Sequence, residues 1–245
     1  MLLHLVRRLY PTTPAVFCDT GLEFPEIRNY IGTWKNVTWI HPKKSFKDVI
    51  TRYGYPVISK QIARSVSDLR NGKNNQKTRE LILTGGKFPG YKFPEKWKFL
   101  LDAPFPISNK CCDIIKHQPF QAYERLTGRY PMVGLLAIES QQRLSRYLQH
   151  PCNIYDARHP ISSPLSIWSE TDIWRYLHEY NIPVATCYEQ GWTRTGCIFC
   201  LFGIQYDETP NRLQRLKETH PRQYQQAIQT YHLNMVMDYL GLPYR

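Results

Sequence analysis

The sequence predicts an α/β fold built on a doubly wound, mostly parallel sheet. Short apolar runs typical of buried strands, such as AVFCDT at residues 15–20, alternate with stretches of helical periodicity along the first part of the chain. The chain has 245 residues, of which 42% are hydrophobic, which is enough to bury one substantial core. An alternation of strands and helices around one core indicates a sheet covered by helices.

The first elements follow this alternation in order. Residues 2–10 (LLHLVRRLY) predict a helix, and residues 15–20 predict a buried parallel strand after the PTTP turn. A helix over residues 26–31 leads to a strand over residues 36–40, which the β-branched and aromatic side chains favour. Residues 46–53 predict a further helix.

The middle of the chain is less regular. Residues 65–94 are rich in Asn, Gly, Lys and Gln and predict an exposed, partly helical basic insertion. Residues 107–128 predict a turn and a helix that ends near Gly128, and residues 131–137 (PMVGLLA) predict another buried strand. Residues 171–180 predict a helix with Asp172 near its N-terminus, where a carboxylate suits the helix dipole.

The last part of the chain, from Pro210, predicts a basic helical tail with apolar residues at helical spacing. We therefore expect an α/β domain over residues 1–205, followed by a helical tail over residues 206–245 that packs on it.

Composition limits the class of protein. No apolar run approaches the roughly 18 to 20 residues that cross a bilayer, and the start MLLHLVRRLYPTT lacks the order of a signal peptide. We expect a cytoplasmic protein with no membrane partner. The formal net charge of +12 suits a phosphate-rich partner such as a nucleotide or a nucleic acid, although a solvated basic surface without a partner stays open.

The strongest local signal is a set of four cysteines. Cys111 and Cys112 are adjacent, and Cys197 and Cys200 form a C-x-x-C pair in a distant segment. Four thiolates from two segments can close around an iron–sulfur cluster or a tetrahedral zinc ion. Adjacent cysteines fit the usual spaced pairs of zinc sites poorly, so the pattern favours the cluster, with buried free thiols as the alternative. The remaining cysteines, which we expect to be small core residues, are Cys18, Cys152 and Cys187.

A second signal follows the first predicted strand. Asp19, Thr20, Gly21 and Glu23 stand directly after it, at a position where polar side chains and a flexible Gly suit the ribose or base of a nucleotide. The same residues also form turns and cap helices, so both interpretations stay open.

In order and spacing, a series of runs resembles the phosphoadenosine phosphosulfate (PAPS) reductase family of the PP-loop superfamily. The runs are AVFCDTGLEFPEIRNYI, YGYPVISK, NKCCDIIK, TGRYPMVGLLAIES, PLSIWSETDIWRYLHEYNIPV and YEQGWTRTGCIFC, and together they span roughly residues 2–224. The resemblance implies a Rossmann-like fold and a [4Fe-4S] cluster held by Cys111, Cys112, Cys197 and Cys200, with zinc less favoured. It also implies that Lys116 lies near the cluster and the substrate.

The resemblance extends to residues that would bind the nucleotide (ATP, APS or PAPS) or the substrate. Gly134, Glu139, Ser140 and Arg143 resemble the family's G-x-x-x-x-E-S-x-x-R segment, although Glu139 and Arg143 can also form an ion pair on one helix. Ser59 and Lys60 resemble a substrate-side pair, and Arg194 stands where it could donate to cluster sulfurs or to an anion. The predicted binding residues are therefore Asp19, Thr20, Gly21, Glu23, Ser59, Lys60, Lys116, Gly134, Glu139, Ser140, Arg143 and Arg194.

The sequence departs from the family pattern in two places. The Ser-Gly-Gly-Lys-Asp-Ser phosphate loop would precede the first helix, so we expect either a start further upstream or loss of the loop. The run Thr84-Gly85-Gly86-Lys87 is not a substitute, because it follows no clear strand and lacks the Asp-Ser. No cysteine follows Cys200 to act as the tail nucleophile of sulfonucleotide reductases, so the catalytic residue is left unassigned.

The resemblance implies an iron–sulfur enzyme, an oxidoreductase or sulfurtransferase, that acts on an adenine-nucleotide-linked substrate. It would work with an electron- or sulfur-donor protein and form a homodimer. The alternatives are a nucleic-acid sulfur-modification enzyme, of the DNA phosphorothioation or tRNA thiolation type, and a non-catalytic cluster-bearing adaptor.

Overall fold

The computed structural model describes residues 1–72, 76–86, 90, 92–150, 152–155, 160–193 and 195–245. The chain forms two compact units, each made from several stretches of sequence. Unit 1 comprises Met1–Phe17, Glu26–Ile40 and Phe120–Glu189, and unit 2 comprises Cys18–Pro25, His41–Pro119 and Gln190–Arg245. The mixture of helices and strands, with parallel strand pairing, confirms the predicted α/β class.

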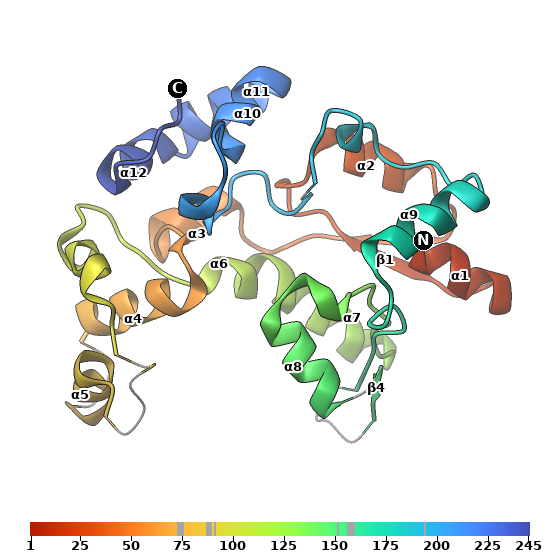
Figure 1. Cartoon of the computed structure of the whole chain (residues 1–245), viewed down its shortest axis with the longest axis horizontal. Coiled ribbons are helices and arrows are strands. Elements are labelled where there is room, and N and C mark those ends of the chain that lie inside the picture. Colours follow the sequence, from red (N-terminus) through yellow and green to blue (C-terminus); the bar gives the residue numbers. More distant parts are fainter. Residues whose placement is uncertain (73–75, 87–89, 91, 151, 156–159, 194) are drawn as a thin grey trace. The chain divides into compact units, whose positions relative to one another are not determined.

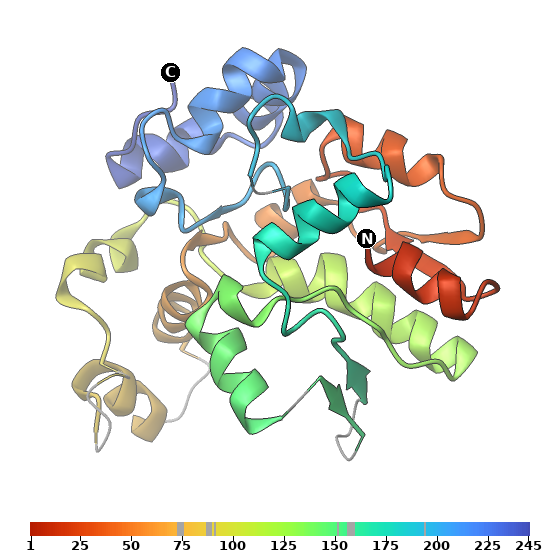
Figure 2. The ribbon, with the colours of Figure 1, turned by 45° about the vertical axis from the view of Figure 1, so that its right-hand side comes forward.

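Unit 1 contains short strands and helices with few fully buried side chains. Strand β1 pairs with β2, β4 pairs antiparallel with β5 (Figure 2), and α1 contacts α9 through a 2.8 Å hydrogen bond between the His4 ring and the Tyr176 hydroxyl. Its elements are α1 (Leu2–Leu9), β1 (Ala15–Cys18), α2 (Pro25–Gly32), β2 (Val37–Ile40), α7 (Gln118–Thr127), η4 (Ala137–Glu139), α8 (Gln141–Gln149), β4 (Asn153–Ile154), β5 (Ile161–Ser162), α9 (Glu170–Glu179) and η5 (Thr186–Tyr188).

Unit 2 contains the larger buried core. Strand β3 pairs in parallel with β6, with Val57 opposite Leu201 and Ile58 opposite Phe202, which joins two distant parts of the chain. Its elements are α3 (Phe46–Arg52), β3 (Val57–Ile58), α4 (Lys60–Arg70), α5 (Gln76–Thr84), η2 (Glu95–Asp102), α6 (Lys110–Cys112), η3 (Asp113–His117), β6 (Leu201–Phe202), η6 (Ile204–Tyr206), α10 (Arg212–Thr219), α11 (Pro221–Gln225), η7 (Gln226–Thr230) and α12 (Leu233–Leu240) (Figure 1).

Most predicted elements are confirmed, and one is wrong. The helices expected over residues 2–10, 26–31, 46–53 and 171–180 form as α1, α2, α3 and α9. The strand expected over residues 131–137 does not form. Met132 makes a single bridge to Ser162, after which the partner segment turns at Ser163–Ser166, so no ladder continues. Pro131, which has no N–H group, contributes only its carbonyl, which accepts from the Ser162 N–H.

The C-terminal helices are part of unit 2. The side-chain amide of Asn211 donates to the Pro243 carbonyl (2.5 Å), and the Tyr224 hydroxyl donates to the Tyr244 carbonyl (2.9 Å). These bonds hold the end of the chain against α10 and α11, and Leu213, Leu216 and Leu233 fill the core beneath them. The segment is helical as predicted, and the boundary at residues 205/206 stays a prediction.

Gly54 positions the segment that leads to the first cysteine pair. Its φ is +117°, and a Cβ atom would lie 2.4 Å from the carbonyl carbon of Pro106, so no side chain fits. This close approach lets Tyr55 pair with Ile107, with the Tyr55 N–H donating to the Pro106 carbonyl at 2.8 Å. The chain then enters α6, which contacts α3.

No helix among the described residues is long and apolar enough to cross a membrane.

Candidate functional site

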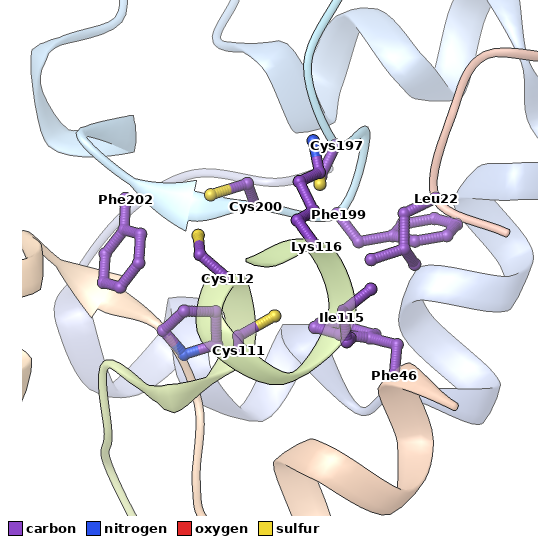
Figure 3. Close-up of a pocket in the computed structure, with 11 residues that line it drawn as sticks. Leu22, Phe46, Cys111, Cys112, Ile115, Lys116, Cys197, Phe199, Cys200 and Phe202 are labelled. Atoms are coloured by element: carbon purple, nitrogen blue, oxygen red, sulfur yellow. The ribbon is translucent and has the colours of Figure 1, made fainter. Parts of the chain in front are cut away.

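The four predicted cysteines line one pocket, and the pocket lies within unit 2. It encloses about 340 Å³, a volume that includes space open to solvent. Figure 3 shows cysteines from two segments on its two sides, with Lys116 beside them. The lining residues are Leu22, Phe46, Pro56, Cys111, Cys112, Ile115, Lys116, Cys197, Phe199, Cys200 and Phe202.

The first segment is a helix that widens directly after its cysteines. The turn of α6 is followed by η3, a π-helical turn over Asp113–His117, and such wide turns recur at functional sites. Cys111 and Ile115 are four residues apart, as are Cys112 and Lys116, so each pair shares a helix face. The segment therefore presents two thiols and one ammonium group to the same pocket.

The second segment is a tight loop that leads into β6. The Cys200 N–H donates to the Cys197 carbonyl (3.1 Å), and the Ile198 N–H donates to the Leu22 carbonyl (2.8 Å). Arg212 holds the end of this loop, because its guanidinium donates to the carbonyls of Cys200 (3.2 Å) and Phe202 (3.1 Å). The same guanidinium forms a two-point ion pair with Asp207, at 2.6 and 2.7 Å.

Burial raises the pKa of three of the pocket thiols. It raises the pKa of Cys111, and it raises the pKa of Cys197 to about 11 although the Lys116 ammonium opposes this shift. Burial also raises the pKa of Cys200. Because thiolates are the species that bind metals, a cation must displace these protons when it binds.

Lys116 is the positive charge of the pocket. Burial alone would lower its pKa, but its coupling to Cys197, which includes a hydrogen bond to that side chain, and the negative charge of Glu23 raise it overall. The side chain therefore stays an ammonium group at neutral pH.

The donor set fits a group held by four thiolates. Cysteine thiolates are the usual ligands of iron–sulfur clusters and suit zinc as well. Across the described part of the chain, no three His, Cys, Asp or Glu side chains are placed so that they could hold a metal ion as they stand.

The Asp19–Glu23 segment forms a turn that uses its own polar groups. The Asp19 carboxylate accepts the Gly21 N–H (3.1 Å), and Gly21 has a φ of +72°, as the turn requires. The Thr20 hydroxyl donates to the Glu23 carboxylate (2.7 Å), which also accepts the Thr20 N–H (3.0 Å). The turn carries Leu22 into the pocket wall, and its contact with a nucleotide stays a prediction.

Ser59 caps helix α4 beside the pocket wall. Its hydroxyl accepts the Ile62 N–H at 3.1 Å. The residue before it, Ile58, has a φ of +62°, which costs a β-branched residue about 1 to 3 kcal/mol. The Ile58 carbonyl accepts from the Gly203 N–H (2.9 Å) and from the Gln205 side-chain amide (3.3 Å), which holds this conformation. Lys60 is exposed at the first position of the helix.

The predicted E-S-x-x-R residues lie in unit 1 and do not belong to the pocket lining. Glu139 and Arg143 form an ion pair with each other, as the alternative interpretation holds, and the Ser140 hydroxyl caps α8 by accepting the Arg143 N–H (3.2 Å). Gly134 packs against Leu165 and Leu2. Arg194 lies outside the described residues.

The Thr84–Lys87 run lies at the wrong end of a helix to bind phosphate. Helix α5 ends at Thr84, and Gly85 and Gly86 both have positive φ values, which is typical of a C-terminus. Phosphate loops need the free N–H groups of a helix N-terminus. Lys87 lies outside the described residues.

The aromatic walls of the pocket and the arginine that holds its loop were not predicted from the sequence. Phe46, Phe199 and Phe202 shield the thiols, and Arg212 fixes the loop from behind. Phe199 and Phe202 could have been suspected from their positions beside the cysteines. No signal in the sequence pointed to Arg212.

Comparison with known proteins finds one family model and several similar enzymes. The family model described as "Phosphoadenosine phosphosulfate reductase domain" matches residues 86–201, a range that holds all four pocket cysteines and Lys116. The adenosine 5'-phosphosulfate reductase of Geobacillus kaustophilus is 22% identical over 200 residues, which cover 82% of this chain and 67% of that protein. Adenosine 5'-phosphosulfate reductase 2 of Bacillus subtilis is 26% identical over 204 residues, 82% of this chain and 66% of that protein.

Proposed function

We propose that the chain is a member of the phosphoadenosine phosphosulfate reductase family and an oxidoreductase that reduces or transfers the sulfur of an adenine-nucleotide-linked substrate. The proposed cofactor is a [4Fe-4S] cluster held by Cys111, Cys112, Cys197 and Cys200. The observation that carries this proposal is the pocket of unit 2, where these four thiols and one ammonium group meet.

A polynuclear cluster suits this donor set better than a single zinc ion. The adjacent pair Cys111 and Cys112 fits the spaced cysteine pairs of zinc sites poorly. A bound cluster would supply redox and electrostatic chemistry next to the substrate. The chain's own residues would shield it, since Leu22, Phe46 and Phe199 are all buried and apolar.

We propose that Lys116 binds the negative charge of the substrate. Its side chain lines the cysteine pocket and interacts with the charge of Glu23. Its raised pKa keeps the ammonium group at neutral pH. In a water-poor pocket this charge attracts an anion more strongly than it would in water. We propose that Lys116 orients the anionic sulfur group of the substrate and balances the negative charge of the thiolates.

We propose nucleotide contacts for the Asp19–Gly21 turn and for the start of α4 at Ser59 and Lys60, all in unit 2. For Gly134 and the segment from Glu139 to Arg143, in unit 1, nucleotide binding is proposed from the family resemblance alone. We further propose a donor protein for electrons or sulfur, a homodimer, and a cytoplasmic location, where the seven free cysteines would stay reduced.

Anaerobic purification of the full chain tests the cofactor. We expect about four irons and four sulfides per chain, with the visible absorption and, after reduction, the EPR signal of a cluster. Cys112→Ser and Cys200→Ser should each abolish iron binding. Cys152→Ser is the matched control, because Cys152 lies in unit 1 and does not line the pocket, so it should keep the full iron content. Zinc, or no metal, in the anaerobic protein would contradict the cluster.

Release of sulfite tests the reaction. The cluster-loaded protein is incubated with adenosine 5'-phosphosulfate or its 3'-phosphorylated form and a reduced dithiol, and sulfite and nucleotide products are measured. Lys116→Gln should lower turnover at least about a hundredfold, since charge stabilisation is a large term in such sites. Iron content should be kept. A loaded protein that releases no product from either substrate would favour the adaptor alternative.

The net charge of +12 favours a second candidate, sulfur modification of a nucleic acid. In this candidate the same pocket serves a sulfur transfer to DNA or tRNA. Thiolated product, with no sulfite from either nucleotide, would distinguish it from the reductase.

A further inference from the structure

Nearly all of the chain's net charge comes from one region. Residues 41–98 contain fourteen of the 32 Lys and Arg but only four of the 20 Asp and Glu. The rest of the chain is close to neutral, with 18 basic and 16 acidic residues. A net charge of +10 is therefore concentrated in less than a quarter of the sequence.

The structure gathers this basic region within unit 2. It consists of α3, β3, α4, α5 and the start of η2, and α4 contacts β3, α5 and η2. Figure 1 shows α4 and α5 next to each other. Seven of the fourteen basic residues are carried by α4 and by α5 and η2, the two elements that contact it.

Ten of the twelve basic side chains that the structure describes in this region are exposed. Those that carry the argument are exposed: Lys43, Lys47, Arg52, Lys77, Lys92 and Lys96. Within the described residues, two ion pairs are seen in this region, Arg64 with Asp68 and Lys98 with Glu95. Asp48 is held by the Ser45 capping box of α3.

The chemistry of the region favours phosphate over a protein partner. Ten of the fourteen basic residues are lysines, and lysine is depleted in protein–protein interfaces. Lysine binds phosphate as a point charge. Two rings lie among these cations: Tyr53 has the Lys44 ammonium 5.0 Å from its ring centre, and Trp97 has the Lys96 ammonium at 5.2 Å. Aromatic rings beside cations are what a single strand uses for base stacking.

We propose that the basic region binds single-stranded nucleic acid through its phosphates. This inference does not depend on which sulfur reaction the pocket performs. The surface also extends toward the thiols, because α3 packs against α6 and the exposed Lys110 directly precedes Cys111. A strand on the basic region would therefore pass close to the cysteine-bearing helix.

Salt-dependent binding tests the proposal. The full chain is titrated into fluorescein-labelled single-stranded RNA and DNA of about 20 nucleotides, and anisotropy is followed between about 50 and 200 mM NaCl. The variant Lys43→Gln/Lys47→Gln/Lys77→Gln/Lys92→Gln should bind at least about tenfold more weakly. Its plot of log affinity against log salt should be flatter by about three, since each lost contact to a single strand removes about 0.7.

A matched variant separates this surface from net charge. Lys35→Gln/Arg125→Gln/Lys217→Gln/Arg222→Gln removes the same charge from exposed positions outside the basic region and should lose less than about threefold in affinity. Equal losses in both variants would overturn the proposal, as would salt-independent binding or none at all. Retention of an acidic polypeptide such as polyglutamate, without binding of the oligonucleotides, would also overturn it, in favour of a protein partner. None of these outcomes changes the iron content expected in the cofactor experiment. The nucleic-acid proposal can therefore fail while the cluster proposal stands, and the reverse also holds.

Discussion

Two arginine–carboxylate pairs show how differently the two units use the same chemistry. Arg212 and Asp207 in unit 2 are 22% and 20% exposed, and Arg212 also donates to the carbonyls of Cys200 and Phe202. Arg143 and Glu139 in unit 1 are 40% and 45% exposed and lie one helical turn apart. The first pair fixes a loop of the pocket, and the second joins neighbours on the surface.

This difference shows that a residue's resemblance to a family motif does not indicate how much it contributes to the structure. Arg143 and Glu139 were singled out in the sequence because they resemble a family segment, and they pair with each other. Arg212 was not singled out, yet it holds the backbone that carries Cys200. Burial and backbone contacts separate the two pairs, and neither is visible in the local sequence.

The largest effect should come from breaking the partly buried Arg212–Asp207 pair of unit 2. Arg212→Met leaves Asp207 without its main counter-charge and frees the loop carbonyls, so the free energy of unfolding should fall by about 3 to 5 kcal/mol. Urea unfolding measures this loss. The iron content should fall with it, because Cys200 is no longer held. A loss below about 1 kcal/mol would show that the pair contributes no more than a surface pair.

A smaller effect should follow from alkaline pH through Cys18 of unit 2. Burial, followed by the charge of Glu23, raises the pKa of this thiol from 9.0 to about 11. A raised pKa means that the folded state keeps the proton longer than the unfolded state. The resulting stabilisation is complete below pH 9 and is lost as the pH rises toward 11, by about 2 kcal/mol for this group.

Cys18→Ala should therefore cost less stability at high pH than at pH 8. The test is urea unfolding of the metal-free protein at a series of pH values, with Val49→Ala as control. Val49 is fully buried in the same unit and does not titrate, so its cost should stay constant with pH. A constant cost for Cys18→Ala would show that the thiol has no raised pKa.

The next effect concerns the two serines that the sequence assigned to binding. Ser59 and Ser140 cap α4 and α8, so replacing either by Ala should lower the free energy of unfolding by about 1 kcal/mol. Ser59→Asn and Ser140→Asn should restore it, because Asn caps well. If Ser59→Asn restores stability while KM for the nucleotide still rises, Ser59 binds substrate as well as capping the helix.

The helices and first strands could be predicted because their signals are local. Apolar spacing gave α1, α3 and α9, and the short β-branched and aromatic run gave β2. The four cysteines could be grouped because thiols are rare and paired in the sequence. The pocket walls could not, because Phe46 and Phe202 come together only through tertiary packing. The prediction of a strand at residues 131–137 was wrong, because strand pairing depends on where the partner segment turns.

The smallest effect should come from the exposed pair in unit 1. Arg143→Met removes an ion pair between side chains that are nearly half exposed, where solvent screens the charges, so the loss should be at most about 0.5 kcal/mol. This near-neutral cost makes the variant a clean test of binding. If Arg143 contacts the nucleotide, KM for adenosine 5'-phosphosulfate should rise while urea unfolding stays unchanged. If stability and KM both stay unchanged, Arg143 serves only its helix, and the resemblance of this segment to the family pattern carries no function here.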